Sequence, residues 1–152
     1  LNLSRTDIRA LLYRVFLRFQ DEFTKRAVSI ELDIAPEVGY AVVDRLKLRE
    51  SVGELLQNAL SALPEAGGRL GLRSRVSEDG MDLLIEVADD GEGVEQSLIN
   101  EAFDPGSENV DGRPRVGLAL TKAIVEQHGG DLAVESVPGG GTYARIRLPL
   151  RD

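Results

Sequence analysis

Residues 87–94, VADDGEGV, have the types and spacing that could bind a ligand. In a strand over residues 81–89, side chains alternate, so Asp89 continues the apolar face while Asp90 points to the other side. A carboxylate in a buried row costs free energy unless donors bond to it, and the two glycines let a ligand approach the backbone closely. We predict that Asp89 accepts a hydrogen bond from a ligand amino group, with adenine as the leading candidate. Because short glycine motifs mislead easily, a satisfied Asp-Gly turn is the alternative for this segment alone.

A second candidate site lies on an expected helix over residues 45–63. Glu54 and Asn58 are one turn apart, on a polar face that also carries Ser51 and Ser61. Carboxylate and amide oxygens at this spacing could hold Mg²⁺, with waters and phosphates completing its shell. The alternative is a solvated helix face.

The third candidate site is the start of a helix expected over residues 117–128. Gly117 leaves free N–H groups at the positive end of the helix dipole, which favours phosphate binding. The preceding loop, residues 104–116, contains two prolines and two glycines and no apolar periodicity, as is typical of lids and binding loops. His128, the only histidine, is expected to be a packed structural residue. The side chains expected to face inward are Leu120, Ala123, Ile124 and Val125.

The other elements must position these groups. A first helix, capped by Ser4 or Thr6, is expected to run from Ile8 to Phe23 along one apolar stripe. Strands are expected over residues 29–34, 40–43, 69–77, 81–89, 131–137 and 142–150. Thr142 shares the parity of the apolar residues after it, so its hydroxyl is expected to face inward. Most strands alternate, so we predict an α/β two-layer sandwich: a mixed, mostly antiparallel sheet with three helices covering one face.

Composition limits the classes of protein that fit. A chain of 152 residues, with 42% hydrophobic and 29% charged residues, is expected to form a single globular domain over residues 1–152. The net charge of −8 argues against a nucleic-acid partner, which favours a basic face. The absence of cysteine excludes disulfides and thiolate metal sites and fits a cytoplasmic location.

In this order, the motifs resemble the boxes of the GHKL ATPase superfamily. Glu54 to Asn58 is similar to its N-box, Asp89 to Gly93 to its DxGxG box, and Phe103 to the phenylalanine motif that follows. Gly117-Leu118 resembles the start of the second glycine box. The HGG at residues 128–130 and the GGGT at residues 139–142 resemble the endings of sensor histidine kinases. Over nearly its whole length, the chain therefore resembles the catalytic, ATP-binding domain of a two-component sensor histidine kinase, which has the Bergerat fold.

This resemblance implies ATP and Mg²⁺ as cofactors and transfer of the γ-phosphoryl group to a histidine. Asp89 would bind the adenine amine, with Thr142 assisting through water, and Asn58 would bind the metal. Amides around Gly117 and Leu118 would hold the phosphates beneath a lid at residues 104–116. The other residues that the resemblance places at the nucleotide are Ala62, Gly91, Gly93, Val94 and Arg115.

The resemblance also implies partners, and it leaves alternatives open. His128 does not match the phosphoacceptor, so the acceptor is expected on a separate dimerisation domain, with a response regulator downstream and this piece a monomer. Arg115 and Ala119 stand where the family usually has glycine, and Ser61 where a basic residue is common. A degenerate kinase domain acting as a docking module is therefore one alternative. A water-splitting GHKL ATPase with Glu54 as the general base is another, and anti-sigma-type serine kinases share the boxes.

Overall fold

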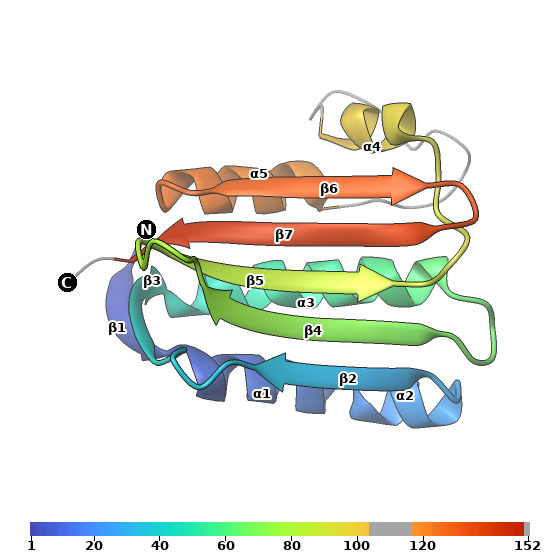
Figure 1. Ribbon diagram of the computed structural model, residues 1–152, viewed down its shortest axis with the longest axis horizontal. Coiled ribbons are helices and arrows are strands. Elements are labelled where there is room, and N and C mark those ends of the chain that lie inside the picture. Colours follow the sequence, from blue (N-terminus) through green and yellow to red (C-terminus); the bar gives the residue numbers. More distant parts are fainter. Residues whose placement is uncertain (104–116, 151–152) are drawn as a thin grey trace.

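A five-stranded mixed sheet forms one layer of the fold (Figure 1). The computed structural model describes residues 1–103 and 117–150. The strand order is β2-β4-β5-β7-β6, with β2 parallel to β4 and the other neighbours antiparallel. The strands are β2 (Ser29–Ile34), β4 (Arg69–Val76), β5 (Asp82–Asp89), β6 (Asp131–Val137) and β7 (Gly141–Pro149). Asp89 thus ends the central strand, opposite Thr142 of β7.

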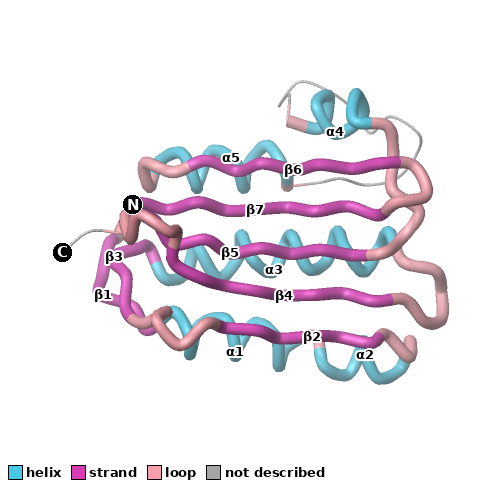
Figure 2. Tube along the Cα trace, in the orientation of Figure 1, coloured by secondary structure: helices cyan, strands magenta, loops and turns pink. Residues whose placement is uncertain are grey.

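Three helices cover the same face of this sheet, as Figure 2 shows. They are α1 (Ile8–Arg18), α3 (Arg45–Ala62) and α5 (Leu118–Gln127). The short α2 (Gln20–Lys25) follows α1, and α4 (Gln96–Ala102) lies beside β6. Between the layers, the inward side chains of the strands, such as Leu72, Ile85 and Ile146, are fully buried. The predicted two-layer sandwich is confirmed.

A strand that was not predicted precedes α1. β1 (Leu3–Asp7) pairs antiparallel with β3 (Tyr40–Asp44), forming a two-stranded sheet separate from the main one. The prediction of Ser4 or Thr6 as the helix cap is therefore wrong, because both lie within β1. The cap is Asp7, whose Oδ1 accepts a hydrogen bond from the Ala10 N–H at 3.1 Å.

Two predicted helices differ in detail. The first does not run unbroken to Phe23, because Phe19 ends α1 and α2 begins at the next residue. On α3, Ser51 lies on the same side as Glu54, but it is not a solvated polar residue. It is buried, and its Oγ donates to the Lys47 carbonyl at 2.9 Å. A hydroxyl bonded to its own helix has its hydrogen bond satisfied and can join the core.

The inward face of α5 also differs from the prediction. Leu120 is 64% exposed and Ala123 is exposed, whereas Leu118 and Thr121 are buried together with Val125. Spacings of three and four residues place these buried positions on one stripe. Leu120 and Ala123 fall outside this stripe, although both are apolar. The prediction chose the inward residues of α5 by their apolar type, but the spacing of the buried positions defines the side that packs against the rest of the domain.

His128 is a buried structural residue, as expected. Its Nε2 accepts a hydrogen bond from the Asp44 N–H at 2.9 Å, and its Nδ1 lies 2.8 Å from the Ile124 carbonyl. The Asp44 carboxylate caps α3 by accepting from the Lys47 N–H at 3.1 Å and also accepts from the Asn2 N–H. These backbone donors lower the pKa of Asp44. His128 therefore joins the end of α5 to the start of α3.

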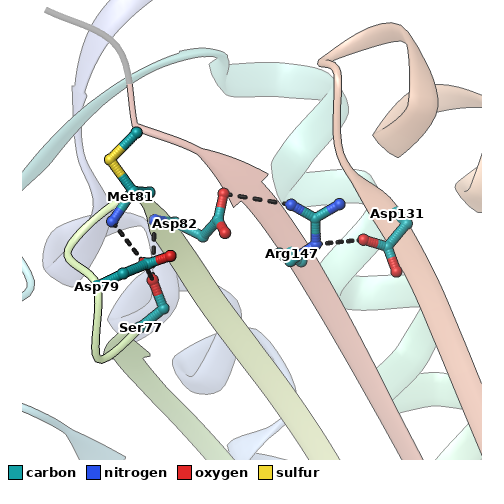
Figure 3. A network of polar contacts seen from close by, with 6 residues as sticks. All are labelled: Ser77, Asp79, Met81, Asp82, Asp131 and Arg147. Carbon is teal, nitrogen blue, oxygen red and sulfur yellow. Dashed lines mark hydrogen bonds and ion pairs between the residues drawn. The ribbon is translucent and has the colours of Figure 1, made fainter.

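A polar network fixes the opposite end of the sheet from Asp89 (Figure 3). From β7, Arg147 donates to Asp131 of β6 and to Asp82 of β5, the latter at 3.3 Å. In the β4–β5 turn, Ser77 donates to Asp79 at 2.6 Å and accepts from the Asp82 N–H. Three strands and one turn are thus held in register away from the candidate site.

Candidate functional site

A cavity lies between the sheet and the helices, at the end of β5 where Asp89 stands. Five of the predicted site residues line it: Asn58, Ala62, Asp89, Leu118 and Thr142. Its other walls are apolar side chains from α3, α4 and the strands. The enclosed volume is about 30 Å³, which is room for little more than a water. A purine would therefore require these walls to move apart.

Asp89 is held in place by the glycine turn that follows β5. The side chain is half-buried, and its Oδ1 accepts a hydrogen bond from the Gly91 N–H at 2.9 Å. A side chain at position 91 would collide with the carbonyl of Ala62 at the end of α3. Glycine therefore allows the turn to pack against α3, which sets the direction of the carboxylate.

A chain of hydroxyl contacts supports the other side of the cavity. The Val94 N–H donates to Ser136 Oγ at 2.8 Å, and this oxygen lies 2.8 Å from Thr142 Oγ1. Gly93, at φ +65°, packs against the Val137 carbonyl, where a side chain would not fit. The inward position of Thr142 is confirmed. Ser136 was not predicted, although it continues the buried row of Leu132 and Val134 on β6 in the way that Asp89 does on β5.

Asn58 carries an unpaired polar atom into this cavity. Its Nδ2 is buried and has no hydrogen-bond partner among the described residues. Leaving such a group unpaired costs about 1–3 kcal/mol, so an unpaired polar atom in a native structure calls for an explanation. Oxygen and nitrogen of an amide exchange places by rotation about the last side-chain bond. The Asn58 amide can thus present either a donor or an acceptor to a ligand.

Glu54 and Gly117 face a neighbouring groove rather than the Asp89 cavity. This groove, of about 490 Å³, also contains Arg18 of α1. Gly117 caps α5 at φ +97°, and a side chain there would collide with the Glu54 carboxylate. Burial raises the pKa of Glu54. Within the described part of the chain, no group of three or more His, Cys, Asp or Glu residues could hold a metal ion.

Sequence reasoning missed the pair formed by Arg18 and Gly53. The Arg18 guanidinium lies over the Gly53 α-carbon, where a side chain at position 53 would collide with it. An arginine at the end of an amphipathic helix looks like a solvated residue, so no signal in the sequence indicated this contact. The predicted lid, residues 104–116, and Arg115 lie outside the described residues. Ala119 is half-buried in the first turn of α5.

Comparisons with known proteins agree with this arrangement. Residues 43–152 match the HATPase_c family, described as histidine kinase-, DNA gyrase B- and HSP90-like ATPase. The chain is 35% identical over 152 residues to the alginate biosynthesis sensor protein KinB of Pseudomonas aeruginosa, covering 99% of this chain and 25% of KinB. It is 40% identical over 100 residues to the sensor histidine kinase DcuS of Escherichia coli K12, covering 65% of this chain and 18% of DcuS. The chain thus spans about a quarter or less of the curated relatives it matches.

Solved structures show the same fold. The catalytic domain of histidine kinase ThkA superposes with a TM-score of 0.86 at 20% identity, covering 99% of each chain. The mycobacterial sensor histidine kinase MprB superposes with a TM-score of 0.80 at 25% identity, also covering 99% of both. No helix built by the described residues is long and apolar enough to cross a membrane. The chain belongs to the HATPase_c family and is the catalytic domain of a sensor histidine kinase, with the Bergerat-like fold of that family.

Proposed function

We propose that this domain binds ATP with the adenine ring beside Asp89 and supplies the γ-phosphoryl group to a histidine on a separate dimerisation domain. The observation that carries the proposal is the Asp89 carboxylate, which the Gly91 N–H orients toward an otherwise largely apolar cavity. A flat purine suits apolar walls, and its amino group suits a carboxylate acceptor. Thr142, directly opposite Asp89, would assist through a water.

The cavity must widen to admit the base. Its walls include Ala62 and Leu118, and Leu118 is the first residue of α5. Gly91, Gly93 and Val94 hold the turn that forms its rim, and their backbone contacts to α3 and β6 are already made. We therefore propose that widening occurs mainly at the α5 side, while the Asp89 side keeps its geometry.

Asn58 is the proposed protein ligand of Mg²⁺. Its amide fits the ion because it is the unpaired polar side chain of the cavity and can turn its oxygen inward. The described residues form no cage, so phosphate oxygens and waters would supply the remaining ligands, as is usual for this ion. Bound there, the ion would neutralise charge on the phosphates during transfer.

The start of α5 is the proposed phosphate site. Amides around Gly117 and Leu118 lie at the positive end of the α5 dipole. The neighbouring Glu54 would act as a base or positioning group, and Arg115 would contribute a positive charge.

Because both ring nitrogens of the buried His128 already have protein partners, the phosphoacceptor is proposed to lie on another domain. ThkA has been solved in complex with the response regulator TrrA, and we propose a response regulator as the downstream partner here.

Calorimetric titration with ATP, with and without Mg²⁺, tests the nucleotide site. We expect saturable binding that Mg²⁺ strengthens, and Asn58→Ala should remove the Mg²⁺ effect while keeping metal-free binding. Asp89→Asn tests the proposed contact with adenine. Its matched control is Asp90→Asn, because Asp90 is exposed and its Oδ1 accepts from the Arg69 N–H outside the cavity. No binding at millimolar ATP would contradict the proposal and favour a non-catalytic docking module.

A second experiment tests the reaction. The domain is mixed with a separately produced dimerisation domain and labelled ATP, and acid-labile phosphohistidine is measured. Phosphorylation of the added domain is the expected result. Steady ATP hydrolysis by this chain alone, abolished by Glu54→Gln, would instead favour a water-splitting ATPase.

A further inference from the structure

The two edges of the main sheet differ in how their backbone groups are used. At β6, the Gln96 side chain of α4 occupies part of the edge: its Nε2 donates to the Val134 carbonyl and its Oε1 accepts from the Ser136 N–H, both at 3.0 Å. An amide in this position makes the bonds that a further strand would make. In Figure 1, α4 lies directly beside β6. The edge at β6 is therefore partly closed.

The alternation of hydrogen bonds in β2 identifies which groups face its partner β4. The Ser29 N–H donates to the Gly68 carbonyl, and the Ala35 N–H donates to the Ser74 carbonyl, both at 2.9 Å. In a parallel pair, alternate residues bond to the same neighbour. The odd-numbered residues of β2 therefore bond to β4.

The backbone N–H and C=O groups of the even-numbered residues of β2 point away from β4, toward the open edge of the sheet. These residues are Ile30, Leu32 and Ile34, and β2 is the last strand on this side. Of the outward backbone groups of these three residues, only the Ile34 carbonyl has a partner among the described residues, which is Arg9 Nη1 at 3.4 Å. The N–H groups of all three and the carbonyls of the first two are left as a template for a further strand.

A groove runs beside this open edge. It has a volume of about 560 Å³ and lies between α1 and β2. Tyr13, which is 52% exposed, forms an apolar wall with Leu32 of β2. The charged residues on the α1 side of the groove are Asp7 and Arg9, and Arg9 donates to backbone carbonyls, including that of Ala35 at 2.8 Å. Asp33 is exposed, and strand alternation places its side chain on the opposite, open face of the sheet. The groove thus supplies an apolar wall, and the acidic charge of the β2 edge lies on the open face, at Asp33.

We propose that the β2 edge is a docking site for a partner protein that adds an extended segment with alternating basic and apolar residues. The backbone of this segment would pair with Ile30, Leu32 and Ile34. Its apolar side chains would enter the groove beside Tyr13, and its basic side chains would face Asp33 on the open face of the sheet. The net charge of −8 of this chain adds to the attraction.

A second copy of this chain does not suit the edge. When β2 pairs with β2 of another copy in antiparallel orientation about Leu32, Glu31 faces Asp33 of the other copy. In parallel orientation, each acidic residue lies beside its own equivalent. Like charges on neighbouring strands destabilise pairing, which is one way in which native edges avoid self-association.

Amide hydrogen exchange on the 152-residue chain tests the template directly. The probe is a blocked seven-residue peptide of alternating lysine and valine, and the control probe has glutamate in place of lysine. Without peptide, the amides of Ile30 and Leu32 should exchange fast while those of Glu31 and Asp33 are protected. The lysine peptide should protect Ile30, Leu32 and Ile34, and the glutamate peptide should not. Protection elsewhere with none at β2, or a dimer in the absence of peptide, would overturn the proposal.

Leu32→Pro and Leu32→Ala form a matched pair of variants. Both lose the leucine side chain, but only proline removes an N–H, and this N–H points away from β4, a position where edge strands accept proline. Leu32→Pro should bind the lysine peptide about tenfold more weakly than Leu32→Ala. Equal affinities would refute pairing through the backbone.

Asp33→Lys tests the charge of the edge with a change that does not touch the backbone. It should weaken binding of the lysine peptide and strengthen binding of the glutamate peptide, and no reversal would contradict the basic partner. ATP titration of each variant should match that of the wild type, because the Asp89 cavity involves no residue of β2. Loss of peptide binding with normal ATP binding thus separates this site from the nucleotide site.

Discussion

Replacing Asp89 by asparagine changes the hydrogen-bonding character of the cavity with little change in shape. In the structure, Asp89 Oδ1 accepts from the Gly91 N–H at 2.9 Å. An asparagine can keep this bond through its own Oδ1, and its NH₂ group then replaces the second carboxylate oxygen. A donor thus faces the adenine amino group, which is also a donor.

The magnitude follows from the bond that is lost. A hydrogen bond to a charged group contributes about 1.5–3 kcal/mol, which corresponds to a loss in ATP affinity of about 10- to 150-fold. Inosine triphosphate carries a carbonyl where ATP carries the amino group. The Asp89→Asn variant should therefore bind inosine triphosphate better than the wild type does, which reverses the preference between the two nucleotides.

Calorimetry with ATP and inosine triphosphate on the wild type, Asp89→Asn and Asp90→Asn measures this preference. Thermal melts provide the control for folding, because retention of the Gly91 bond should keep the change in unfolding free energy below about 1 kcal/mol. ATP affinity of Asp89→Asn within twofold of the wild type, or an equal loss for both nucleotides, would refute recognition of the purine amino group by Asp89.

Three further substitutions test other parts of the structure. His128→Phe leaves the buried Asp44 N–H without an acceptor, so urea unfolding should show a loss of about 1–3 kcal/mol. Burial raises the pKa of Glu54 above its ordinary 4.5, so the unfolded state binds fewer protons there and stability falls as the pH rises through the raised pKa. Glu54→Gln should remove this fall in melts between about pH 4 and pH 7, and an unchanged pH profile would contradict the reasoning. Gly141→Ala places a side chain against the Asp89 carbonyl at φ +80°, so it should cost more than about 1 kcal/mol and weaken ATP binding in calorimetry.

Strand periodicity made much of the fold predictable. Alternation in β4 and β5 identified the hairpin, and parity placed Asp89 and Thr142 on the inward face, where the structure shows that both line one cavity. β1 could not be found in this way, because only Thr6 of its residues is buried and the strand exists through its pairing with β3.

Other residues were misplaced or missed because contacts between elements, which the sequence pattern does not show, decide their positions. Leu120 is apolar but exposed, and Thr121 is polar but buried, so residue type misplaced the inward face of α5. The contact of Arg18 with Gly53 depends on a long side chain that crosses from one helix to another. Ser136 is different, because its parity on β6 carried the same signal as that of Asp89, and applying one rule to both strands would have found it.

Gln96 has a consequence for assembly. A fibre built by joining sheets edge to edge requires each copy to have two unpaired edge strands. In this fold, the Gln96 amide already occupies part of the β6 edge beside α4. Among the described residues, the main sheet therefore offers its more open edge at β2, which favours addition of one partner segment over repeated stacking of the main sheets of many copies.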